Sequence, residues 1–347
     1  LDPQDLQVAG PGAKLDLVLF GVIDWHFRFQ RPQQLATELA REGHRVFYVS
    51  TNFLDQEDQG FRIEPLDDDG RLFQVFLAAR NPPSIYADAP SPPQIAQLQA
   101  GVDSFITWAG SETNILVLNH PFWWSIAADR QRAALLYDRM DYHRGFGGLP
   151  AGLVEDEETL MERADLVVSS SQWLEHDTAR FTSRHVLIRN GADYDHFARR
   201  PAKVYRDPRG RRVLGYYGAI AGWLDTDLLG AVADAFPDSS LVLIGRDQSG
   251  VTRRLSRYPN LAYMDEVPYA DLPTFLHGFD VCLLPRRITA LTNAMNPVKL
   301  YEYLCAGLPV VATNLPEVKE FDGLVYSCNT TEAFISAIAT ALEEPAD

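Results

Sequence analysis

Cysteine and positive charge are both scarce in this sequence. The three cysteines, Cys282, Cys305 and Cys328, are odd in number, widely spaced and without a CxxC pair. They argue against a disulfide framework and favour buried thiols in a reducing compartment. The 31 basic residues are outnumbered by 47 acidic residues, which gives a net charge of −16. Because nucleic acid is itself an anion, we expect no nucleic-acid partner, although a local basic patch is compatible with this balance.

Long apolar runs and several catalytic motifs are also missing. No run approaches the length of a membrane-spanning helix. The motifs GxxxxGK(S/T), HExxH and GxSxG are absent, and no GxGxxG follows the first predicted strand. The sequence offers no obvious cluster of zinc ligands. These absences argue against several common enzyme classes, among them the nicotinamide-dependent dehydrogenases, which need the glycine fingerprint.

Short apolar runs alternate along the chain with segments of helical periodicity, which is typical of parallel sheets covered by helices. The predicted strands are residues 14–23, 44–50, 71–77, 114–119, 134–138, 165–170, 185–188, 211–218, 239–245, 279–285 and 308–313. We predict an α/β fold of two doubly wound Rossmann-like domains that face each other across a cleft. Residues 1–198 and 211–347 form the domains, and the polar, proline-containing stretch 199–210 is the linker. Ligands of such sheets bind beyond the carboxyl ends of the strands.

The segment NPVKLYEYLCAGLPVVAT (296–313) reads as a helix followed by a buried strand. Asn296 suits the N-cap and Pro297 the first helical position, so Lys299 falls in the first turn, where a cation opposes the helix dipole. One explanation is an i,i+3 ion pair with Glu302 on an exposed helix face. The other is an anion at the helix start, with Lys299 on a phosphate and Glu302 on a ribose diol. The residues alone leave both explanations open.

The same segment resembles the donor-site helix of retaining GT-B fold glycosyltransferases of family four. The family pattern has two glutamates eight residues apart and then AxGxPVVA; Glu302 and the ending AGLPVVAT match it. Ala294 stands at the first glutamate's place, and the segment is similar to a subgroup with NPxKxYEY. The resemblance implies that Asn296 or Thr292 takes over the missing glutamate's contact with the donor sugar.

The resemblance extends over most of the chain. VLGYYGAIAGWLD (213–225) matches the family's glycine loop, where Gly218 and Ala219 would let the backbone approach the diphosphate. The arginine and lysine that usually follow are replaced by small or aromatic residues. The resemblance therefore implies that Lys299 neutralises the phosphates, with Arg246, Arg286 or Arg287 behind it. The backbone around Val267 is expected to hold the nucleotide base. A plain strand-to-helix turn and a solvent-exposed Arg246 are the alternatives.

The loop after the first strand, GVIDWHFRFQRPQQLA (21–36), crowds polar side chains between aromatic ones. The resemblance implies that it faces the acceptor and the donor phosphates, whereas a helix cap with a solvated charge cluster is the alternative. We expect one of the two alternating sets, aromatic or polar, to be buried. The predicted acceptor-binding residues are Asp24, Arg28 and, from NHPFWW (119–124), His120; His26 and Arg31 are predicted to assist catalysis.

The segment YDRMDYHRGF (137–146) also follows a strand. Asp138 and Asp141 lie where many members of the family carry a histidine close to the transferring sugar. A carboxylate there would orient the acceptor hydroxyl or accept its proton, so both are candidate catalytic residues. Alternatively, Asp138 only caps the following turn.

The resemblance implies a metal-independent, hexosyltransferase-type enzyme without a cofactor. It would move a sugar from a nucleotide-diphosphate sugar to a hydroxyl of a glycan or lipid-linked acceptor, with retention, in bacterial surface polysaccharide synthesis. The expected place is the cytoplasm, with the inner membrane face as an option. One alternative is a non-catalytic GT-B domain that binds glycan or nucleotide sugar, favoured by Ala294 and the altered glycine loop. A nucleotide-sugar epimerase is another.

The ends of the chain suggest a domain taken from a longer protein. The chain starts at Leu1 without a methionine, and it ends in a helix-like run, EAFISAIATALEEPAD. Processing or removal of a tag would give similar ends. We therefore expect further domains of a longer chain among the partners.

Overall fold

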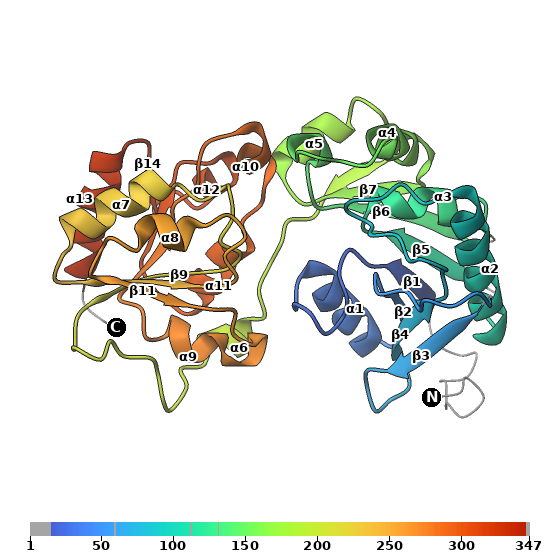
Figure 1. The fold of residues 1–347 in the computed structure, drawn as a ribbon, viewed down its shortest axis with the longest axis horizontal. Helices are drawn as coiled ribbons and strands as arrows, with labels where there is room; N and C mark the ends of the chain where they lie inside the picture. Colours follow the sequence, from blue (N-terminus) through green and yellow to red (C-terminus); the bar gives the residue numbers. More distant parts are fainter. Residues whose placement is uncertain (1–14, 59, 112, 131, 345–347) are drawn as a thin grey trace. The chain divides into compact units, whose positions relative to one another are not determined.

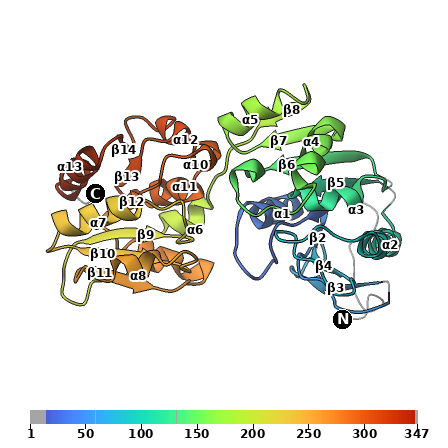
Figure 2. The ribbon, with the colours of Figure 1, turned by 45° about the horizontal axis from the view of Figure 1, so that its top comes forward.

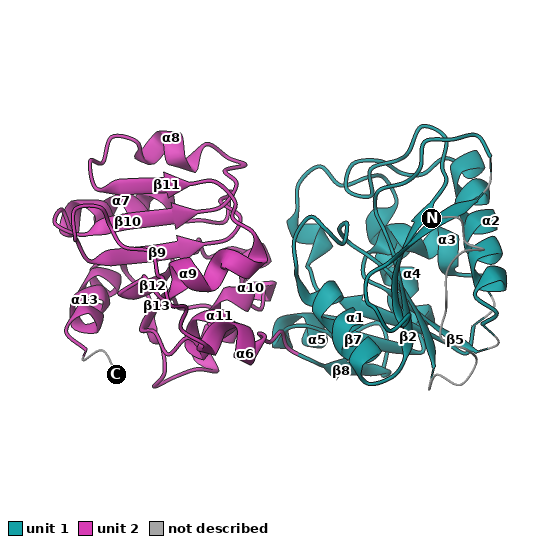
Figure 3. Cartoon of the chain, turned by 90° about the horizontal axis from the view of Figure 1, so that it is seen from below, with its two compact units in different colours: residues 1–188 teal, residues 189–347 magenta. Residues whose placement is uncertain are grey.

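The computed structural model describes residues 15–344 apart from Gln59, Glu112 and Gln131. The chain divides into two compact units, Leu1–Ile188 and Arg189–Asp347, which Figure 3 draws in different colours. Each unit is an α/β domain around one sheet, as predicted. No helix of the described part is both long and apolar enough to cross a membrane.

The boundary between the units lies ten residues before the predicted one. Residues 189–210 belong to the second unit, so the stretch 199–210 is not a free linker. The main-chain N–H of Tyr205 donates to the carbonyl of Thr274 (2.8 Å), and the ring of His277 lies 2.9 Å from the carbonyl of Phe197. Phe197 itself is fully buried. The segment shows no regular spacing of apolar residues because the buried Phe197 and main-chain hydrogen bonds are enough to attach it to the second unit.

The first unit has one eight-stranded sheet in the order β3-β4-β2-β1-β5-β6-β7-β8 (Figure 1). Only the edge strand β3 runs antiparallel to its neighbour. The strands are β1 (Asp16–Phe20), β2 (Arg45–Val49), β3 (Phe61–Pro65), β4 (Leu72–Leu77), β5 (Asn114–Leu118), β6 (Ala134–Arg139), β7 (Leu166–Ser169) and β8 (His185–Leu187). The helices are α1 (Arg31–Arg41), α2 (Pro92–Trp108), α3 (Trp124–Ala127), α4 (Leu153–Arg163) and α5 (Gln172–Thr178), with 3-10 turns at Pro121–Trp123 and His143–Gly145.

Both faces of the central strands are covered, which explains their continuous apolar runs. In β1, Val18 and Phe20 join the core on one face of the sheet. Their neighbours Leu17 and Leu19 join a smaller core on the other face, together with Ala36 of α1. The alternation along one strand therefore fixes α1 on the face opposite to α2, and it leaves the loops after β1, β5 and β6 at one edge.

The second unit has a six-stranded, fully parallel sheet in the order β11-β10-β9-β12-β13-β14 (Figure 2). The strands are β9 (Val213–Tyr217), β10 (Ser240–Ile244), β11 (Leu261–Met264), β12 (Val281–Leu284), β13 (Val310–Thr313) and β14 (Tyr326–Cys328). The helices are α6 (Tyr194–Ala198), α7 (Thr226–Ala235), α8 (Val251–Leu255), α9 (Leu272–Leu276), α10 (Ala290–Ala294), α11 (Val298–Cys305), α12 (Pro316–Lys319) and α13 (Thr331–Leu342), with a 3-10 turn at Tyr269–Asp271. Two cores, one on each face, again bury the central strands.

Candidate functional site

In the second unit, the start of α11 departs from the predicted capping. The helix begins at Val298, with Pro297 as the N-cap and no side-chain cap. Asn296 lies one residue earlier, and its side chain is committed elsewhere. Its amide nitrogen donates to Glu317 (2.7 Å), and its amide oxygen accepts from the main-chain N–H of Asn190 (3.0 Å). The prediction that Asn296 caps the helix is wrong, because this amide braces the chain segment that leads into α11.

Lys299 and Glu302 form the predicted i,i+3 ion pair. The Lys299 Nζ lies 3.2 and 3.1 Å from the two carboxylate oxygens of Glu302. The pair is not on an exposed face, since Glu302 is only 3% exposed and accepts a second hydrogen bond from the Tyr217 hydroxyl (2.6 Å). The Nζ also lies 4.9 Å from the centre of the Tyr217 ring. Burial, followed by the charge of Glu302, raises the pKa of Tyr217 well above its usual value, so the phenol stays a donor to Glu302.

The turn after β9 lies directly beside Lys299. Gly218 has φ +136°, and a Cβ added there would approach the Lys299 Cε to 3.5 Å. Gly245, which follows β10, has φ +138°, and a Cβ there would lie 2.0 Å from the carbonyl oxygen of Gly218. The positive φ favours glycine at both positions, and at Gly245 the close approach of the Gly218 backbone also leaves no room for a Cβ. The carboxyl ends of β9 and β10 and the first turn of α11 therefore meet at one place.

A third strand end adds an arginine to this place. The guanidinium carbon of Arg286, which follows β12, lies 5.9 Å from the ring centre of Tyr216 and 5.8 Å from that of Trp223. The hydroxyl of Tyr216 donates to the carbonyl of Ala219 in the turn after β9 (3.0 Å). Arg286 therefore lies against the glycine loop, in which small and aromatic residues stand where the resemblance expects basic ones.

The other predicted donor residues of the second unit take different positions. Arg246 and Arg287 are exposed, and Val267 is half-buried against a core. Thr292 is fully buried, and its hydroxyl donates to the carbonyl of Arg287 while accepting from the N–H of Thr289. Thr292 therefore closes the turn into α10, and its hydroxyl is already satisfied.

In the first unit, Asp24 shapes the loop after β1. One of its carboxylate oxygens accepts from Ser50 and from Gln74 (2.7 Å each), and the other accepts from the main-chain N–H of His26 (3.0 Å). The loop borders a pocket of about 430 Å³. Its lining residues are Val22, Ile23, Asp24, His26, Phe27, Thr51, Asn52 and Tyr86. Asp24 therefore positions the pocket wall through its own hydrogen bonds.

The aromatic residues of this loop do not form one buried set. Trp25 packs edge-on against Tyr48 at 5.2 Å, whereas Phe27 at the pocket is half exposed. The guanidinium of Arg28 lies 4.8 Å from the centre of the Phe27 ring. His26 is exposed, and its Nε2 lies 2.9 Å from Glu64. The predicted division into one buried and one open set is wrong, because aromatic side chains occur in both environments.

Arg31 and Asp138 lie together in the interior of the first unit. The Arg31 Nε donates to Asp138 Oδ2 (3.0 Å), its Nη2 donates to Oδ1 (2.8 Å), and the amide of Asn119 adds a further bond (3.2 Å). Both charged residues are at most 9% exposed. Asp138 therefore neither caps a turn nor stands open to a substrate; it neutralises Arg31.

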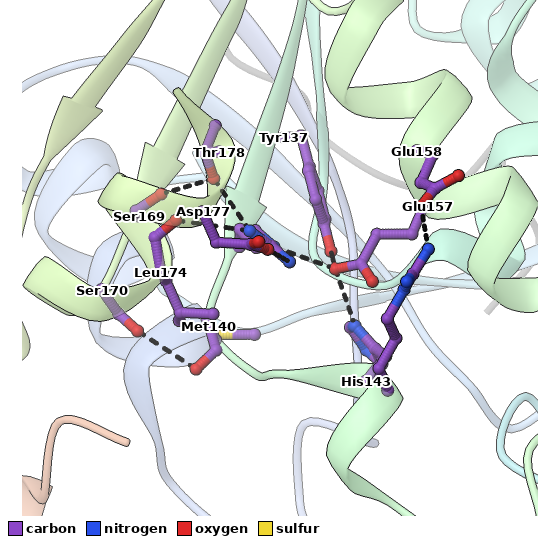
Figure 4. A network of polar contacts seen from close by, with 12 residues as sticks. Tyr137, Met140, His143, Glu157, Glu158, Ser169, Ser170, Leu174, Asp177 and Thr178 are labelled. Atoms are coloured by element: carbon purple, nitrogen blue, oxygen red, sulfur yellow. Dashed lines mark hydrogen bonds and ion pairs between the residues drawn. The ribbon is translucent and has the colours of Figure 1, made fainter. Parts of the chain in front are cut away.

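A second buried network, which the sequence did not indicate, centres on Glu157 of α4 (Figure 4). Its Oε1 accepts from the Tyr137 hydroxyl (2.9 Å), the Arg139 Nε (3.0 Å) and the His143 Nδ1 (3.1 Å). Burial alone would raise the pKa of Glu157, but the hydrogen bond and charge of His143, followed by the charge of Arg139, lower it to about 2. Glu157 reads in sequence as one more polar residue of an amphipathic helix, so no local signal marks it.

His120 and Asp141 lie beside this network. The Nδ1 of His120 accepts from the N–H of Phe122 (3.2 Å), and its ring contacts the rings of Tyr86 (5.4 Å) and His143 (4.9 Å). Burial, followed by the charge of His143, lowers the pKa of His120 to about 3. Burial raises the pKa of the half-buried Asp141, and His143 opposes that shift. His120, which the lowered pKa keeps neutral, thus lies with Asp141 and His143 after β5 and β6. The described residues include no group of three or more His, Cys, Asp or Glu side chains suited to a metal ion.

Both sequence comparisons match glycosyltransferases. Residues 212–344 match the family model described as glycosyl transferases group 1. Over 175 residues, 47% of this chain, the sequence is 29% identical to a putative teichuronic acid biosynthesis glycosyltransferase, TuaH, of Bacillus subtilis (strain 168). The match spans 44% of that relative, which is less than half of its length.

Solved structures share the fold at low sequence identity. An alpha,alpha-trehalose 6-phosphate synthase from Burkholderia multivorans has a TM-score of 0.68 at 11% identity, over 96% of this chain and 91% of that one. The catalytic domain of starch synthase IV from Arabidopsis thaliana, bound to ADP and acarbose, has a TM-score of 0.64 at 12% identity, over 94% and 91%. These similarities identify the GT-B fold.

Proposed function

Because residues 212–344 match the family model of the group 1 glycosyl transferases, we propose that this protein is a glycosyltransferase. The protein transfers a hexose-type sugar from a nucleotide-diphosphate sugar to a hydroxyl of a glycan or lipid-linked acceptor, with retention and without a metal ion. The similarity to a teichuronic acid biosynthesis protein supports a role in bacterial surface polysaccharide synthesis. Donor binding is assigned to the second unit and acceptor binding to the first.

The observation that carries the proposal is the contact of Lys299 with Glu302 beside Gly218. The first turn of α11 has N–H groups without helical partners, and the Lys299 ammonium lies in that turn. A diphosphate bound there receives charge-assisted hydrogen bonds, and these strengthen as the sugar leaves and negative charge develops. Glu302 has lone pairs left on its two oxygens for the hydroxyls of a ribose.

Arg286 supplies the positive charge that the glycine loop lacks. A diphosphate needs more than one cation to balance its charge, and Ala219 stands in a loop without basic side chains. Arg286 lies against that loop, held over the rings of Tyr216 and Trp223. Arg246 is exposed at the end of the neighbouring strand and adds a weaker, solvent-screened contribution.

On the acceptor side, Asp141 is the better of the two candidate carboxylates. Asp138 is neutralised by Arg31, whereas Asp141 lies half-buried beside His120 and His143. A carboxylate there orients an acceptor hydroxyl. The half-exposed rings of Phe27 and Tyr86 at the pocket offer apolar faces on which a sugar ring packs.

A binding screen tests the donor site. Uridine, guanosine, adenosine and thymidine diphosphates and their sugar conjugates are titrated by calorimetry into the wild type, Lys299→Ala and Lys319→Ala. Lys319 is an exposed lysine on α12 and serves as the matched control. We expect one nucleoside diphosphate to bind the wild type and Lys319→Ala alike, and Lys299→Ala to bind it at least about tenfold more weakly. Equal binding by Lys299→Ala would make the lysine only a partner of Glu302.

Ala294 and the altered glycine loop favour one alternative, a non-catalytic domain, and a nucleotide-sugar epimerase is a second alternative. A non-catalytic binding domain would bind a nucleotide sugar without turning it over. A nucleotide-sugar epimerase would convert the donor without an acceptor. Product analysis of the bound donor, with and without simple alkyl glycosides as acceptors, separates them from a transferase, which makes a new glycoside only when the acceptor is present.

The proposed place is the cytoplasm, with peripheral contact to the inner membrane face. The residues that favour this contact are exposed and basic, and they lie within the segment 199–209 of the second unit: Arg199, Arg200, Lys203, Arg206 and Arg209. Each basic residue near an anionic bilayer contributes roughly 1 kcal/mol. Sedimentation with phosphatidylglycerol vesicles, but not with phosphatidylcholine vesicles, is expected at low salt, and its absence would remove the membrane contact from the proposal.

A further inference from the structure

The pocket beside Phe27 and Tyr86 lies entirely within the first unit. It is bordered by the loops that follow β1, β2 and β4, which are neighbouring parallel strands of one sheet. Ligands of parallel sheets bind at the carboxyl ends of the strands, where these loops lie. The pocket volume of about 430 Å³ is at the lower end of the range for small-molecule sites, roughly 300–1,000 Å³. We therefore expect a small ligand, of the size of a single sugar ring.

Two aromatic rings form the apolar wall of this pocket. Phe27 is 50% exposed and Tyr86 is 53% exposed, so about half of each side chain is open to a ligand. Tyr86 is fixed at its tip, because its hydroxyl donates to the carbonyl of Val22 (2.5 Å). Its ring also packs edge to face against the buried His120, with the ring centres 5.4 Å apart. A ring that is both open and fixed loses little freedom when the C–H face of a sugar packs on it.

Two polar side chains of the pocket have no partner. Thr51 and Asn52 follow β2, and neither side chain makes a hydrogen bond to another described residue. A side-chain amide carries two donors and an acceptor, and a hydroxyl both donates and accepts. Sugar hydroxyls need such mixed partners, whereas an alkyl chain leaves them unsatisfied. The polar part of the pocket therefore favours a sugar over the chain of a lipid.

Buried hydrogen bonds hold Asn52 in place at the pocket. Its main-chain N–H donates to the Ser50 hydroxyl oxygen (3.0 Å), and that hydroxyl donates to Asp24 (2.7 Å). The same carboxylate oxygen accepts from the amide of Gln74 (2.7 Å). Ser50 and Gln74 are fully buried. The loop after β2 is thus attached to the loop after β1 in the absence of a ligand, and the pocket is preformed.

We propose that this pocket binds one sugar ring of the acceptor, with Tyr86 as its stacking platform and Asn52 as the residue that selects among sugars. The assignment rests on the proposed glycosyltransferase function, and it narrows the acceptor to one that ends in a sugar. Tyr86 comes from a proline-containing loop and Asn52 from a short turn, and neither stands in a recognisable motif.

The first experiment measures the binding of simple glycosides and needs no donor. Methyl glycosides of glucose, galactose, mannose, N-acetylglucosamine and glucuronic acid are titrated into protein with ¹³C-labelled tyrosine. The NMR signal of Tyr86 is assigned with Tyr86→Phe, which keeps the ring. We expect at least one glycoside to shift this signal, and Tyr86→Ala to bind that glycoside at least about fivefold more weakly. A Tyr86 signal that no glycoside moves would overturn the inference.

Tyr194→Ala is the matched control, because it removes an exposed tyrosine of the second unit. It should bind the glycoside like the wild type. Tyr86→Phe should keep most of the affinity, since only the bond to the Val22 carbonyl is lost. Circular dichroism and the unfolding midpoint establish that each variant is folded. If the folded Tyr86→Ala binds the glycoside as tightly as the wild type does, Tyr86 is no platform and the proposal is wrong.

The selecting role of Asn52 is tested with deoxy sugars. Asn52→Ala should bind the preferred glycoside about three- to tenfold more weakly, as expected for one lost hydrogen bond. The monodeoxy glycoside that lacks the contacted hydroxyl should bind the wild type and Asn52→Ala alike. The control is Asn329→Ala, which changes an exposed asparagine of the second unit. Equal affinities of wild type and Asn52→Ala across the whole series would remove Asn52 from the site.

Methyl and octyl glycosides of the same sugar distinguish a sugar site from a lipid site. If the ring occupies the pocket, Tyr86→Ala weakens both glycosides by the same factor. If the wild type binds the octyl glycoside more tightly and Tyr86→Ala abolishes that gain, the pocket holds the alkyl chain. The second result would contradict the proposal.

Turnover separates this proposal from the function on which it rests. With the donor found by the binding screen, Tyr86→Ala and Asn52→Ala should raise the KM for the acceptor and leave kcat and nucleotide affinity nearly unchanged. A protein that binds glycosides at Tyr86 but binds no nucleotide contradicts the proposed function and keeps the sugar site. A protein that transfers sugar with the same acceptor KM in the wild type and both variants contradicts the sugar site alone.

Discussion

Arg31 and Asp138, 107 residues apart in the sequence, face each other in the interior of the first unit. The Arg31 Nε and Nη2 lie 3.0 and 2.8 Å from opposite oxygens of the carboxylate, so both charges are satisfied by one planar contact. The contact joins the first residue of α1 to the end of β6. Two residues that look catalytic in the sequence thus fix the position of a helix on the sheet.

Breaking this pair should destabilise the protein strongly. Arg31→Met leaves Asp138 buried without its cation, which costs roughly 3–5 kcal/mol in the free energy of unfolding. The double variant Arg31→Met/Asp138→Leu removes both charges and should recover much of that loss. Urea unfolding followed by fluorescence measures both. If Arg31→Met unfolds like the wild type but loses turnover, Arg31 acts on the substrate and the structural assignment is wrong.

The lowered pKa of His120 predicts that the folded protein loses stability in mild acid. Its pKa is lowered to about 3 in the folded protein against 6.5 in the unfolded chain, so the unfolded state binds the extra proton first. Its contribution is complete above pH 6.5 and is lost as the pH falls toward 3. Between pH 6.5 and 4.5, where Glu157 contributes little, the expected loss is roughly 2 kcal/mol.

The measurement is the free energy of unfolding between pH 7 and pH 4.5 for the wild type and His120→Gln. Glutamine can still accept from the N–H of Phe122, so the variant should fold but have a shallower pH dependence. His176→Gln, which changes an exposed imidazole, should follow the wild type. Parallel curves for the wild type and His120→Gln would show that His120 is protonated in the folded state as readily as in water.

The sequence predicts the central strands well because burial on both faces makes them continuous apolar runs. β1 and β2 are of this kind, and every residue of both strands is buried. The edge strand β3 (Phe61–Pro65) escapes prediction because it alternates weakly and exposes charged Arg62 and Glu64 at least in part. The short edge strands β11 and β14 also escape prediction, because β11 has no buried residue and only one of the three residues of β14, Cys328, is buried.

In the candidate site, contacts between residues close in the sequence could be predicted, whereas contacts between distant segments could not. The ion pair of Lys299 with Glu302 follows from helical spacing, so the sequence predicts it directly. The contact of Asp138 with Arg31 and that of His143 with Glu157 depend on which strands and helices become neighbours. No pattern within a window of residues carries that information, so the burial of Asp138 against Arg31 could not be predicted from the sequence.

Gly245 should tolerate no side chain. A Cβ there would lie 2.0 Å from the main-chain oxygen of Gly218, and φ is +138°. Gly245→Ala must shift one strand end or the other, so we expect a loss of roughly 3 kcal/mol or more in stability together with weaker nucleotide binding. Gly307→Ala is the matched control, since Gly307 also has positive φ (+67°) but open space around its Cβ. It should lose only about 1–2 kcal/mol, and equal losses would refute the close approach.

Arg286 should govern recognition of the diphosphate and not of the nucleoside. Its guanidinium is held over Tyr216 and Trp223 beside a loop without basic residues. A charge-assisted hydrogen bond contributes roughly 1.5–3 kcal/mol, so Arg286→Gln should weaken nucleoside diphosphate binding about 10- to 100-fold. Binding of the same nucleoside without phosphates should change little, and Arg253→Gln, an exposed arginine on α8, should bind both like the wild type. If Arg286→Gln weakens both ligands equally, the arginine supports the shape of the loop, and the second phosphate contact must come from Arg246 or Arg287.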